Sequence, residues 1–286
     1  MNNRNKDKDR HVIETLGRAR VVVEDGKVVE IGRPVLKYCP LWAKIRGIEE
    51  INERVIKDNV EFRIRDFGMC TAERALELDV FVGFGASETL MTALHKGLLD
   101  ATVTVCEGAG TVITSNPALV QGIGARLGGI IETSPVEAIL RGISERGGVT
   151  LVPPAIDQPA GLRIALRMGY KRVGVTVCTV EDAEQCRAIS EDAIIFGVHL
   201  TGITRSDAER LFQVADLVTA CASRYIRELA NERAILQAGT AIPIFALTPA
   251  GKELLLERAK EIEDRLLLSA MQLPMLPAEK QPIPLV

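Results

Sequence analysis

Short runs of aliphatic residues alternate with amphipathic segments along most of the chain beyond residue 80. Runs of this length, rich in Val and Ile and bounded by polar residues, are typical of buried strands, whereas apolar residues three to four positions apart are typical of helices. The predicted strands lie at 101–105, 129–131, 149–152, 172–177, 193–198, 216–220 and 242–247. The predicted helices lie at 87–96, 157–169, 181–189, 206–214, 223–236 and 249–267, and two more begin at Asn116-Pro117 and Ser134-Pro135.

This alternation predicts the arrangement of the strands. Strands and helices that follow one another through short connections usually form parallel strands with helical crossovers. We therefore expect an α/β fold with a mostly parallel, doubly wound sheet. A closed barrel is the alternative, but about seven strands are counted here and not eight.

The first 80 residues show a different pattern. Two valine-rich runs flank Asp25-Gly26, which is a strong signal for a two-residue hairpin turn. Pro40 excludes the interior of a regular strand, and apolar spacing predicts a helix over 48–64. The charged start of the chain, to Arg10, indicates a frayed tail. The predicted organisation is a hairpin-plus-helix region, an α/β domain and a Pro-rich tail, at residues 1–80, 81–268 and 269–286.

The Pro-rich tail cannot form a regular element, because proline lacks the backbone donor that helices and sheets need. It either wraps the surface of its own chain or reaches a neighbouring subunit. The second interpretation would make the protein a homo-oligomer.

Composition narrows the function classes. Hydrophobic residues make up 47% of the chain and aromatic residues only 4%, so the core is aliphatic, as in sheets buried on both faces. A net charge of −3 without a basic stripe argues against nucleic-acid binding. The sequence has no signal-peptide pattern and no apolar run long enough to span a membrane. We expect a cytoplasmic protein without membrane or nucleic-acid partners.

Reactive side chains follow several of the predicted strands. Cys106, Cys178, His199 and Cys221 each come directly after a strand. Ligands of open α/β sheets bind outside the carboxyl ends of the strands, so we expect a site at these loops. The alternative is that the cysteines are small packing residues, which is the interpretation we prefer for Cys186 in mid-helix.

The loop after the first of these strands, CEGAGT at 106–111, carries the most candidate chemistry. Cys106 is a candidate nucleophile, with Glu107 or His199 as its acid or base. Glycines let a backbone approach a ligand closely, although neither a dinucleotide fingerprint nor a Walker A sequence is present. A tight turn and a solvated carboxylate are the alternatives. The predicted cofactor-binding residues are Gly108, Gly110, Thr111, Thr201 and Gly202.

The cysteines also suggest a metal centre. The chain has no CxxC pair, but ligands need only converge in space. Four cysteines lie in loops: Cys39, Cys70, Cys106 and Cys221. If those loops meet, four thiolates would suit an iron–sulfur cluster or zinc.

Seven segments of the chain form a distinctive set of motifs: KYCPLW (37–42), EFRIRDFGMCT (61–71), VCEGAGTVIT (105–114), LVQGIGARLGGIIETSP (119–135), AIDQPAGLRIALRMGYKRVGVTV (155–177), HLTGIT (199–204) and ADLVTACASRYIREL (215–229). In this order they resemble the archaeal family called methanogenesis marker protein 8. The resemblance implies an anaerobic archaeal cytoplasm and a role near methyl-coenzyme M reductase, its maturation proteins or its cofactors. It implies no catalytic residues.

Three hypotheses follow from the sequence. The first is an accessory or maturation factor that binds a metal, an iron–sulfur cluster or a cofactor through loop cysteines. The second is an enzyme that acts on a small anionic metabolite with Cys106 as nucleophile. The third is a non-catalytic subunit that binds a partner protein.

Overall fold

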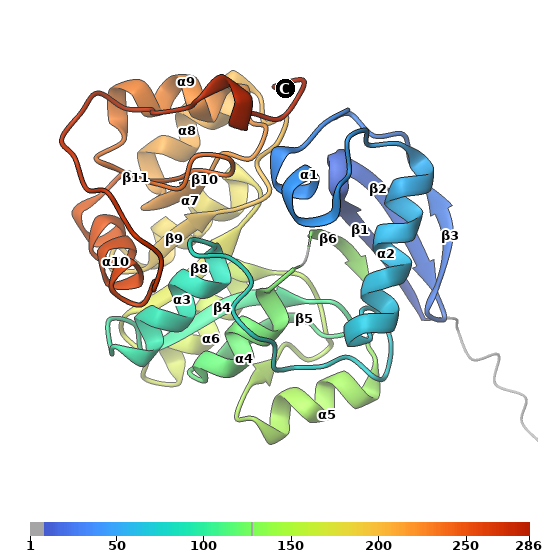
Figure 1. The fold of residues 1–286 in the computed structure, drawn as a ribbon. Helices are drawn as coiled ribbons and strands as arrows, with labels where there is room; N and C mark the ends of the chain where they lie inside the picture. Colours follow the sequence, from blue (N-terminus) through green and yellow to red (C-terminus); the bar gives the residue numbers. More distant parts are fainter. Residues whose placement is uncertain (1–8, 127) are drawn as a thin grey trace, which may run out of the picture.

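The computed structural model describes residues 9–126 and 128–286, which fold into two β-sheets with helices around them (Figure 1). The smaller sheet has the strand order β3-β2-β1-β6, and the larger has the order β11-β12-β10-β9-β8-β4-β5-β7. The structure therefore confirms the predicted mixture of helices and sheets, the α/β class. The predicted frayed tail falls largely on residues 1–8, which lie outside the described residues.

The strands are β1 (Arg10–Thr15), β2 (Ala19–Glu24), β3 (Lys27–Ile31), β4 (Ala101–Cys106), β5 (Gly110–Thr114), β6 (Gly129–Thr133), β7 (Val149–Thr150), β8 (Val173–Val177), β9 (Ile194–Gly197), β10 (Leu217–Thr219), β11 (Leu236–Ala238) and β12 (Ile244–Ala246). The helices are α1 (Pro40–Arg46), α2 (Glu53–Phe67), α3 (Ala86–His95), α4 (Pro117–Gly124), α5 (Glu137–Glu145), α6 (Gln158–Arg167), α7 (Val180–Ile189), α8 (Arg205–Val214), α9 (Arg224–Arg233) and α10 (Pro249–Lys260). Short 3₁₀ turns lie at η1 (Leu16–Arg18) and η2 (Ala278–Lys280).

The smaller sheet is antiparallel throughout its described strands. Asp25 and Gly26 form the predicted hairpin turn between β2 and β3, and both have positive φ, at 48° and 72°. The fourth strand, β6, comes from the region that was predicted to build the α/β domain. It pairs with β1 instead, where His11 lies opposite Thr133.

The prediction of a mostly parallel sheet is not confirmed. In the larger sheet, as described, only the β4–β8, β8–β9 and β9–β10 neighbours are parallel. The other four pairs are antiparallel. The cause at one edge is the CEGAGT segment, where Gly108 (φ 80°) and Gly110 (φ 73°) let the chain turn back at once, so that β5 pairs with β4.

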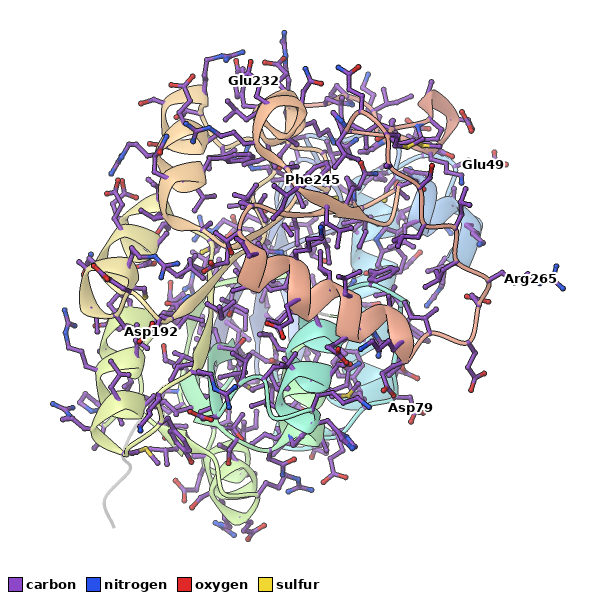
Figure 2. All side chains as sticks on the ribbon, turned by 90° about the vertical axis from the view of Figure 1, so that its left-hand side faces the viewer. Glu49, Asp79, Asp192, Glu232, Phe245 and Arg265 are labelled. Atoms are coloured by element: carbon purple, nitrogen blue, oxygen red, sulfur yellow. The ribbon has the colours of Figure 1, made fainter. Side chains whose placement is uncertain are left out.

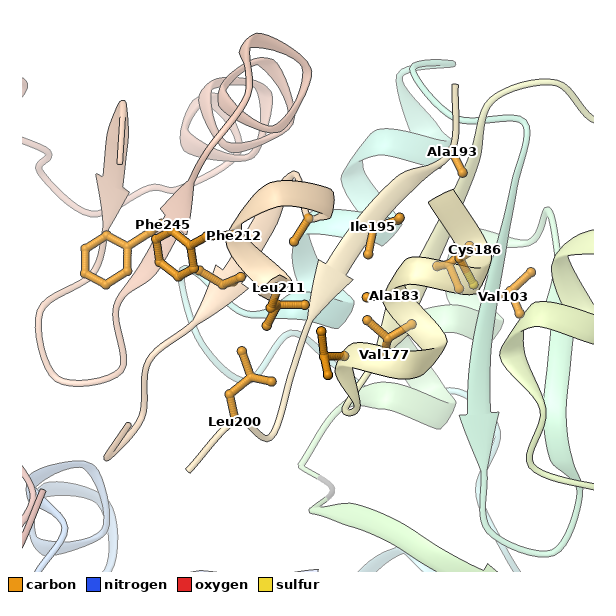
Figure 3. Close-up of a cluster of buried hydrophobic side chains, with 14 of the residues drawn as sticks. Val103, Val177, Ala183, Cys186, Ala193, Ile195, Leu200, Leu211, Phe212 and Phe245 are labelled. Carbon is orange, nitrogen blue, oxygen red and sulfur yellow. The ribbon is translucent and has the colours of Figure 1, made fainter. Parts of the chain in front are cut away.

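Helices cover both faces of the larger sheet. Helices α6, α7, α8 and α9 pack on one face against strand residues such as Val175 and Ile195. Helices α3, α4 and α10 pack on the other face against residues such as Phe196 and Leu217. Figure 3 shows the first of these clusters, in which Cys186 has no solvent exposure. The interpretation of Cys186 as a packing residue is therefore confirmed.

After α10 the chain passes α9 and the edge strand β11, where Gln272 contacts Asn231 and Met275 contacts Gln237, and then reaches the N-terminal region. Figure 2 shows α10 across the front of the view and the following segment, with Arg265 pointing away from the protein. Further along, Ile283 pairs with Tyr38, and the backbone of Val286 pairs with Ala222 and Arg224. No helix among the described residues is long and apolar enough to cross a membrane.

Candidate functional site

A cavity of about 580 Å³ lies between the smaller sheet and the carboxyl ends of the parallel strands. Its floor consists of the ends of β8, β9 and β10, and its other walls come from β1, α1, α2, the segment before α3 and β6. This volume falls within the range of pockets that hold small molecules. The position agrees with the rule that ligands bind outside the carboxyl ends of parallel strands.

The residues that follow the parallel strands do line this cavity. Cys178 follows β8, His199 and Thr201 follow β9, and Cys221 follows β10. Cys39 at the start of α1 joins them from the N-terminal region. The prediction from the strand ends therefore identified residues that line the cavity, but it did not decide between metal binding, catalysis and packing for them.

The CEGAGT segment lies elsewhere. Cys106 and Glu107 have no solvent exposure, and neither lines the cavity. Nε of Arg74 donates to Oε1 of Glu107 in a fully buried ion pair. Burial, followed by the charge of Glu107, raises the pKa of Cys106 well above its usual value. A reactive cysteine needs an accessible thiolate, so this environment opposes a nucleophilic role for Cys106.

The glycines of that segment contact protein and not open space. A Cβ on Gly108 would meet the side chain of Ile139, and one on Gly110 would meet the backbone of Ala155. The hydroxyl of Thr111 accepts a hydrogen bond from the backbone N–H of Asp157. All three predicted cofactor-binding residues of the segment are buried and serve its packing.

The four candidate metal ligands separate into two places. Cys39 and Cys221 line the cavity, whereas Cys70 and Cys106 are buried beside the Arg74–Glu107 pair. Within the described ranges, no group of three or more His, Cys, Asp or Glu residues is arranged to hold a metal ion. The structure does not bring the predicted four thiols together.

Gly202, another predicted cofactor-binding residue, has a different role. Its φ is 75°, and a Cβ there would fall on the guanidinium of Arg18. The missing side chain thus leaves room for Arg18 to reach from η1 to the loop after β9. Arg18 lines the cavity and forms an ion pair with Glu14 at 3.6 Å.

The sequence reasoning missed the most informative residue of the cavity, Arg63 on α2. Arg63 lines the cavity and is only 5% exposed. Its Nη1 atom has no hydrogen-bond partner among the described residues. The guanidinium lies 5.3 Å from the centre of the Trp42 ring. Burial and the nearby Arg126 and Arg46 lower the pKa of Arg63 to about 10.

A signal for Arg63 was present in the sequence. Ile56, Val60 and Phe67 are buried residues of α2, and Arg63 falls on the same stripe, three to four positions from its neighbours. A charged residue on the apolar face of a helix is unusual, because burying an unpaired charge costs free energy. Thr15 adds a second buried polar atom at the cavity wall, since its Oγ1 has no partner in the described structure.

His199 lies near Arg63 and is held in an unusual backbone conformation. Its φ of 55° is in the left-handed region, which few residues other than glycine adopt. The residue is solvent-exposed and lines the cavity. Burial, followed by the positive charge of Arg63, lowers the pKa of His199 to about 4. The imidazole is therefore neutral near pH 7.

Backbone strain is concentrated around this cavity. Five non-glycine residues in the described ranges have positive φ, and three of them, Arg18, Arg126 and His199, line the cavity. Such conformations often mark functional sites, where the surrounding fold holds them in place. Arg126 also forms an ion pair with Asp66 and lies over the Phe81 ring.

Comparison with known proteins supports an archaeal assignment. The family described as "Uncharacterized protein conserved in archaea (DUF2099)" matches residues 11–260. A Methanocaldococcus jannaschii protein, "Uncharacterized protein MJ0054", is 50% identical over 284 residues, which cover 97% of this chain and 100% of that protein. No solved structure matches the chain. The archaeal part of the resemblance is thus confirmed, and the chain belongs to the archaeal family DUF2099.

Proposed function

We propose that this protein binds a small anionic metabolite or cofactor in the cavity, with Arg63 as the residue that holds the anion. The observation that carries the proposal is the buried Nη1 of Arg63, which has no hydrogen-bond partner in the described residues. Buried polar groups are nearly always paired, and guanidinium groups suit carboxylates and phosphates. A bound anion would supply the partner that the protein itself does not.

The surroundings of Arg63 support an anion. Arg126 and Arg18 line the same cavity, and the neutral His199 adds a further polar group. Glu14 is paired with Arg18, and Glu88 accepts hydrogen bonds from Ser87 and Gln121. The carboxylates therefore have partners, whereas Arg63 retains binding capacity.

The rest of the wall is largely apolar, and this limits the ligand. Leu36, Leu41, Val177, Val198 and Ile242 all face the cavity. Apolar walls with a few placed polar groups are typical of sites for organic molecules. We infer a ligand with an anionic end and an apolar body, and not a bare inorganic ion.

This proposal joins two of the sequence-based hypotheses. It keeps the small anionic ligand of the second and the cofactor-binding accessory protein of the first, and it moves the site from Cys106 to Arg63. The resemblance to the methanogenesis marker family supports a role beside methyl-coenzyme M reductase or its maturation proteins. In such a role the cavity would hold a cofactor and not a metal cluster.

A fluorescence titration tests the proposal, because Trp42 is the only tryptophan of the chain and lies against Arg63 in the cavity wall. The purified protein is titrated with inorganic phosphate, benzoate and 2-oxoglutarate, and Trp42 emission is recorded. We expect saturable changes with the organic anions. Native mass spectrometry of protein from cells should also detect a co-purifying organic anion.

Two variants make the titration specific. Arg63→Met retains an unbranched side chain of similar volume and removes the charge, and it should weaken anion binding by at least about tenfold, the value of a charge-assisted hydrogen bond. Arg54→Gln is the matched control on the same helix, because Arg54 has 91% of its side chain exposed. Unchanged binding in Arg63→Met would overturn the proposal.

A further inference from the structure

We propose that α1 is a lid over the anion site, which opens to let a ligand reach Arg63 and closes behind it. This inference rests on the proposed function, because the lid controls access to the same guanidinium. Its starting point is the burial of the binding atom, since Nη1 of Arg63 is shielded from solvent in this structure. An anion can therefore reach Nη1 only when a group that covers it moves.

Helix α1 carries such a group. The ring of Trp42, on α1, has its centre 5.3 Å from the guanidinium of Arg63, and the neighbouring Leu41 also lines the cavity. Figure 1 shows α1 on the side of the N-terminal region that faces the larger sheet. Movement of α1 away from α2 therefore uncovers the guanidinium of Arg63.

The contacts that hold α1 in place are few. The helix has seven residues, and none of them is buried. Helices this short are not stable on their own in water, so α1 depends on its contacts with the rest of the protein. Leu41 and Trp42 pack against the core of the N-terminal region, but both are only half-buried. Few buried apolar contacts are typical of segments that open locally.

The segment that carries α1 is closed at its base. The backbone N–H of Ile51 donates to the carbonyl oxygen of Lys37 at 2.8 Å, so residues 38–50 leave and return at one point. Tyr38 is fixed at this base by its backbone pairing with Ile283. Compact loops whose ends meet in this way are frequently functional. The base can stay in place while α1 tilts.

A second cation–π contact holds the lid from outside the cavity. The guanidinium of Arg46, on α1, lies 4.0 Å from the centre of the Phe62 ring on α2. Arg46 is exposed, and neither residue lines the cavity. Exposed contacts of this kind contribute little free energy each. The contact can therefore break and form again without unfolding of the protein.

Closure of α1 affects both the strength and the rate of binding. A closed lid excludes water from Arg63, and its attraction to a bound anion increases because the surroundings screen the charges less. The ligand must wait for opening both when it enters and when it leaves. The lid therefore slows association and dissociation together, and a looser lid accelerates both.

Arg46→Gln loosens the lid without changing the cavity wall. In the ligand-free protein, the rate at which N-ethylmaleimide modifies Cys39 reports opening, because Cys39 lies directly before α1 and is only 4% exposed. We expect Cys39 to react about two- to fivefold faster in Arg46→Gln, the factor that one exposed cation–π contact supports. Cys186 is the internal control, because it is buried in the core of the larger sheet and its rate should not change.

Two further variants separate the ring contact from the charge. Arg46→Lys keeps a cation that can lie over the Phe62 ring, so its Cys39 rate should stay within about twofold of the wild-type rate. Lys44→Gln removes an exposed charge from the same helix and should leave the Cys39 rate unchanged.

Stopped-flow fluorescence measures the effect of the lid on the ligand. The four proteins are mixed with 2-oxoglutarate or benzoate, and Trp42 emission is followed in time. Association and dissociation should both be about two- to fivefold faster in Arg46→Gln than in the wild-type protein. The rates of Lys44→Gln should equal those of the wild-type protein.

The two measurements distinguish the lid from the anion site. A Cys39 rate that is unchanged in Arg46→Gln, or that rises equally in Lys44→Gln, overturns the lid. Probe binding at wild-type rates in Arg46→Gln also overturns the lid and leaves the proposed function intact. If no probe changes Trp42 fluorescence in any of the four proteins, the proposed function fails, and a faster Cys39 rate then shows an opening helix that admits no anion.

Discussion

The guanidinium of Arg63 lies 5.3 Å from the centre of the Trp42 ring, and both side chains form part of one cavity wall. A cation over an aromatic face is attracted to it, but this contact leaves Nη1 without a hydrogen-bond partner in the described chain. The ligand-free protein therefore retains a buried charge that is only partly compensated. Residues that oppose stability in this way are often kept for function.

The Arg63→Met variant should be more stable than the wild-type protein in the absence of ligand. Methionine fills similar space without the cost of burying a charge, and replacing buried ion pairs by apolar residues of similar volume is often neutral or stabilising by roughly 1–4 kcal/mol. Urea unfolding followed by circular dichroism measures the free energy of unfolding. A loss of stability would indicate that Arg63 is a structural residue and would argue against an anion site.

His199 should titrate near pH 4 in the folded protein, well below its ordinary value of 6.5. Because the unfolded chain binds a proton at higher pH than the folded chain does, the stability of the protein should fall as the pH is lowered from 6.5 towards 4. NMR of the histidine ring protons, with His199→Asn to assign the signal, gives the midpoint.

The same variant should reduce the loss of stability on acidification but not abolish it. Burial also lowers the pKa of His11, which acts in the same direction. A His199 midpoint at or above 6.5 would show that the ring is not held neutral by its surroundings.

The ion pair of Arg74 and Glu107 should prove structural. Glu107→Gln removes one charge of a fully buried pair and leaves the other uncompensated, which usually costs about 3–5 kcal/mol. The double variant Arg74→Met/Glu107→Gln should cost less than the sum of the single variants, because the two residues interact.

Lys96→Gln provides the comparison for that pair. Lys96 pairs with Glu261 at the surface, where both side chains are about 40% exposed, and such pairs contribute at most about 1 kcal/mol. Chemical denaturation of the wild-type protein, the two single variants, the double variant and Lys96→Gln measures the differences. If Glu107→Gln were as mild as Lys96→Gln, Glu107 would not be the buried structural carboxylate described above.

Five of the six thiols should react with N-ethylmaleimide in a definite order. Cys178 is exposed and should react first, followed by Cys221 through the cavity. Cys70, Cys106 and Cys186 are buried and should react only after unfolding. Peptide mass spectrometry after timed exposure reports the order. Early modification of Cys106 would reopen its candidacy as a nucleophile.

Local signals in the sequence predicted many elements correctly. Asn116 and Asp157 cap α4 and α6 as expected, since each side chain accepts a hydrogen bond from the first turn of its helix. The Asp25-Gly26 turn also lies where it was predicted. These features depend on a few adjacent residues, so a single sequence contains the information for them.

Long-range pairing was predicted less well. No strand was predicted over 110–114, but this segment folds back as β5, because Gly108 and Gly110 permit a tight turn after β4. The partner of β6 depends on β1, more than 100 residues away along the chain. Local patterns contain no information about such partners.

Only part of the candidate site could be predicted, because local patterns do not show which distant segments meet. Strand ends lie at one edge of a parallel sheet, so Cys178, His199 and Cys221 could be placed together from sequence. Arg63 reaches the cavity from a helix of the N-terminal region, and only the packing of the two sheets shows this. Cys106 was misplaced because its strand enters a hairpin and not a crossover.

The central claim, that Arg63 holds an anionic ligand in the cavity, is tested most directly by titrating Trp42 fluorescence in wild-type, Arg54→Gln and Arg63→Met proteins with 2-oxoglutarate and benzoate. The account predicts saturable binding in the first two proteins and binding at least about tenfold weaker in Arg63→Met. Equal affinity in all three proteins, or no response in the wild-type protein, would contradict it.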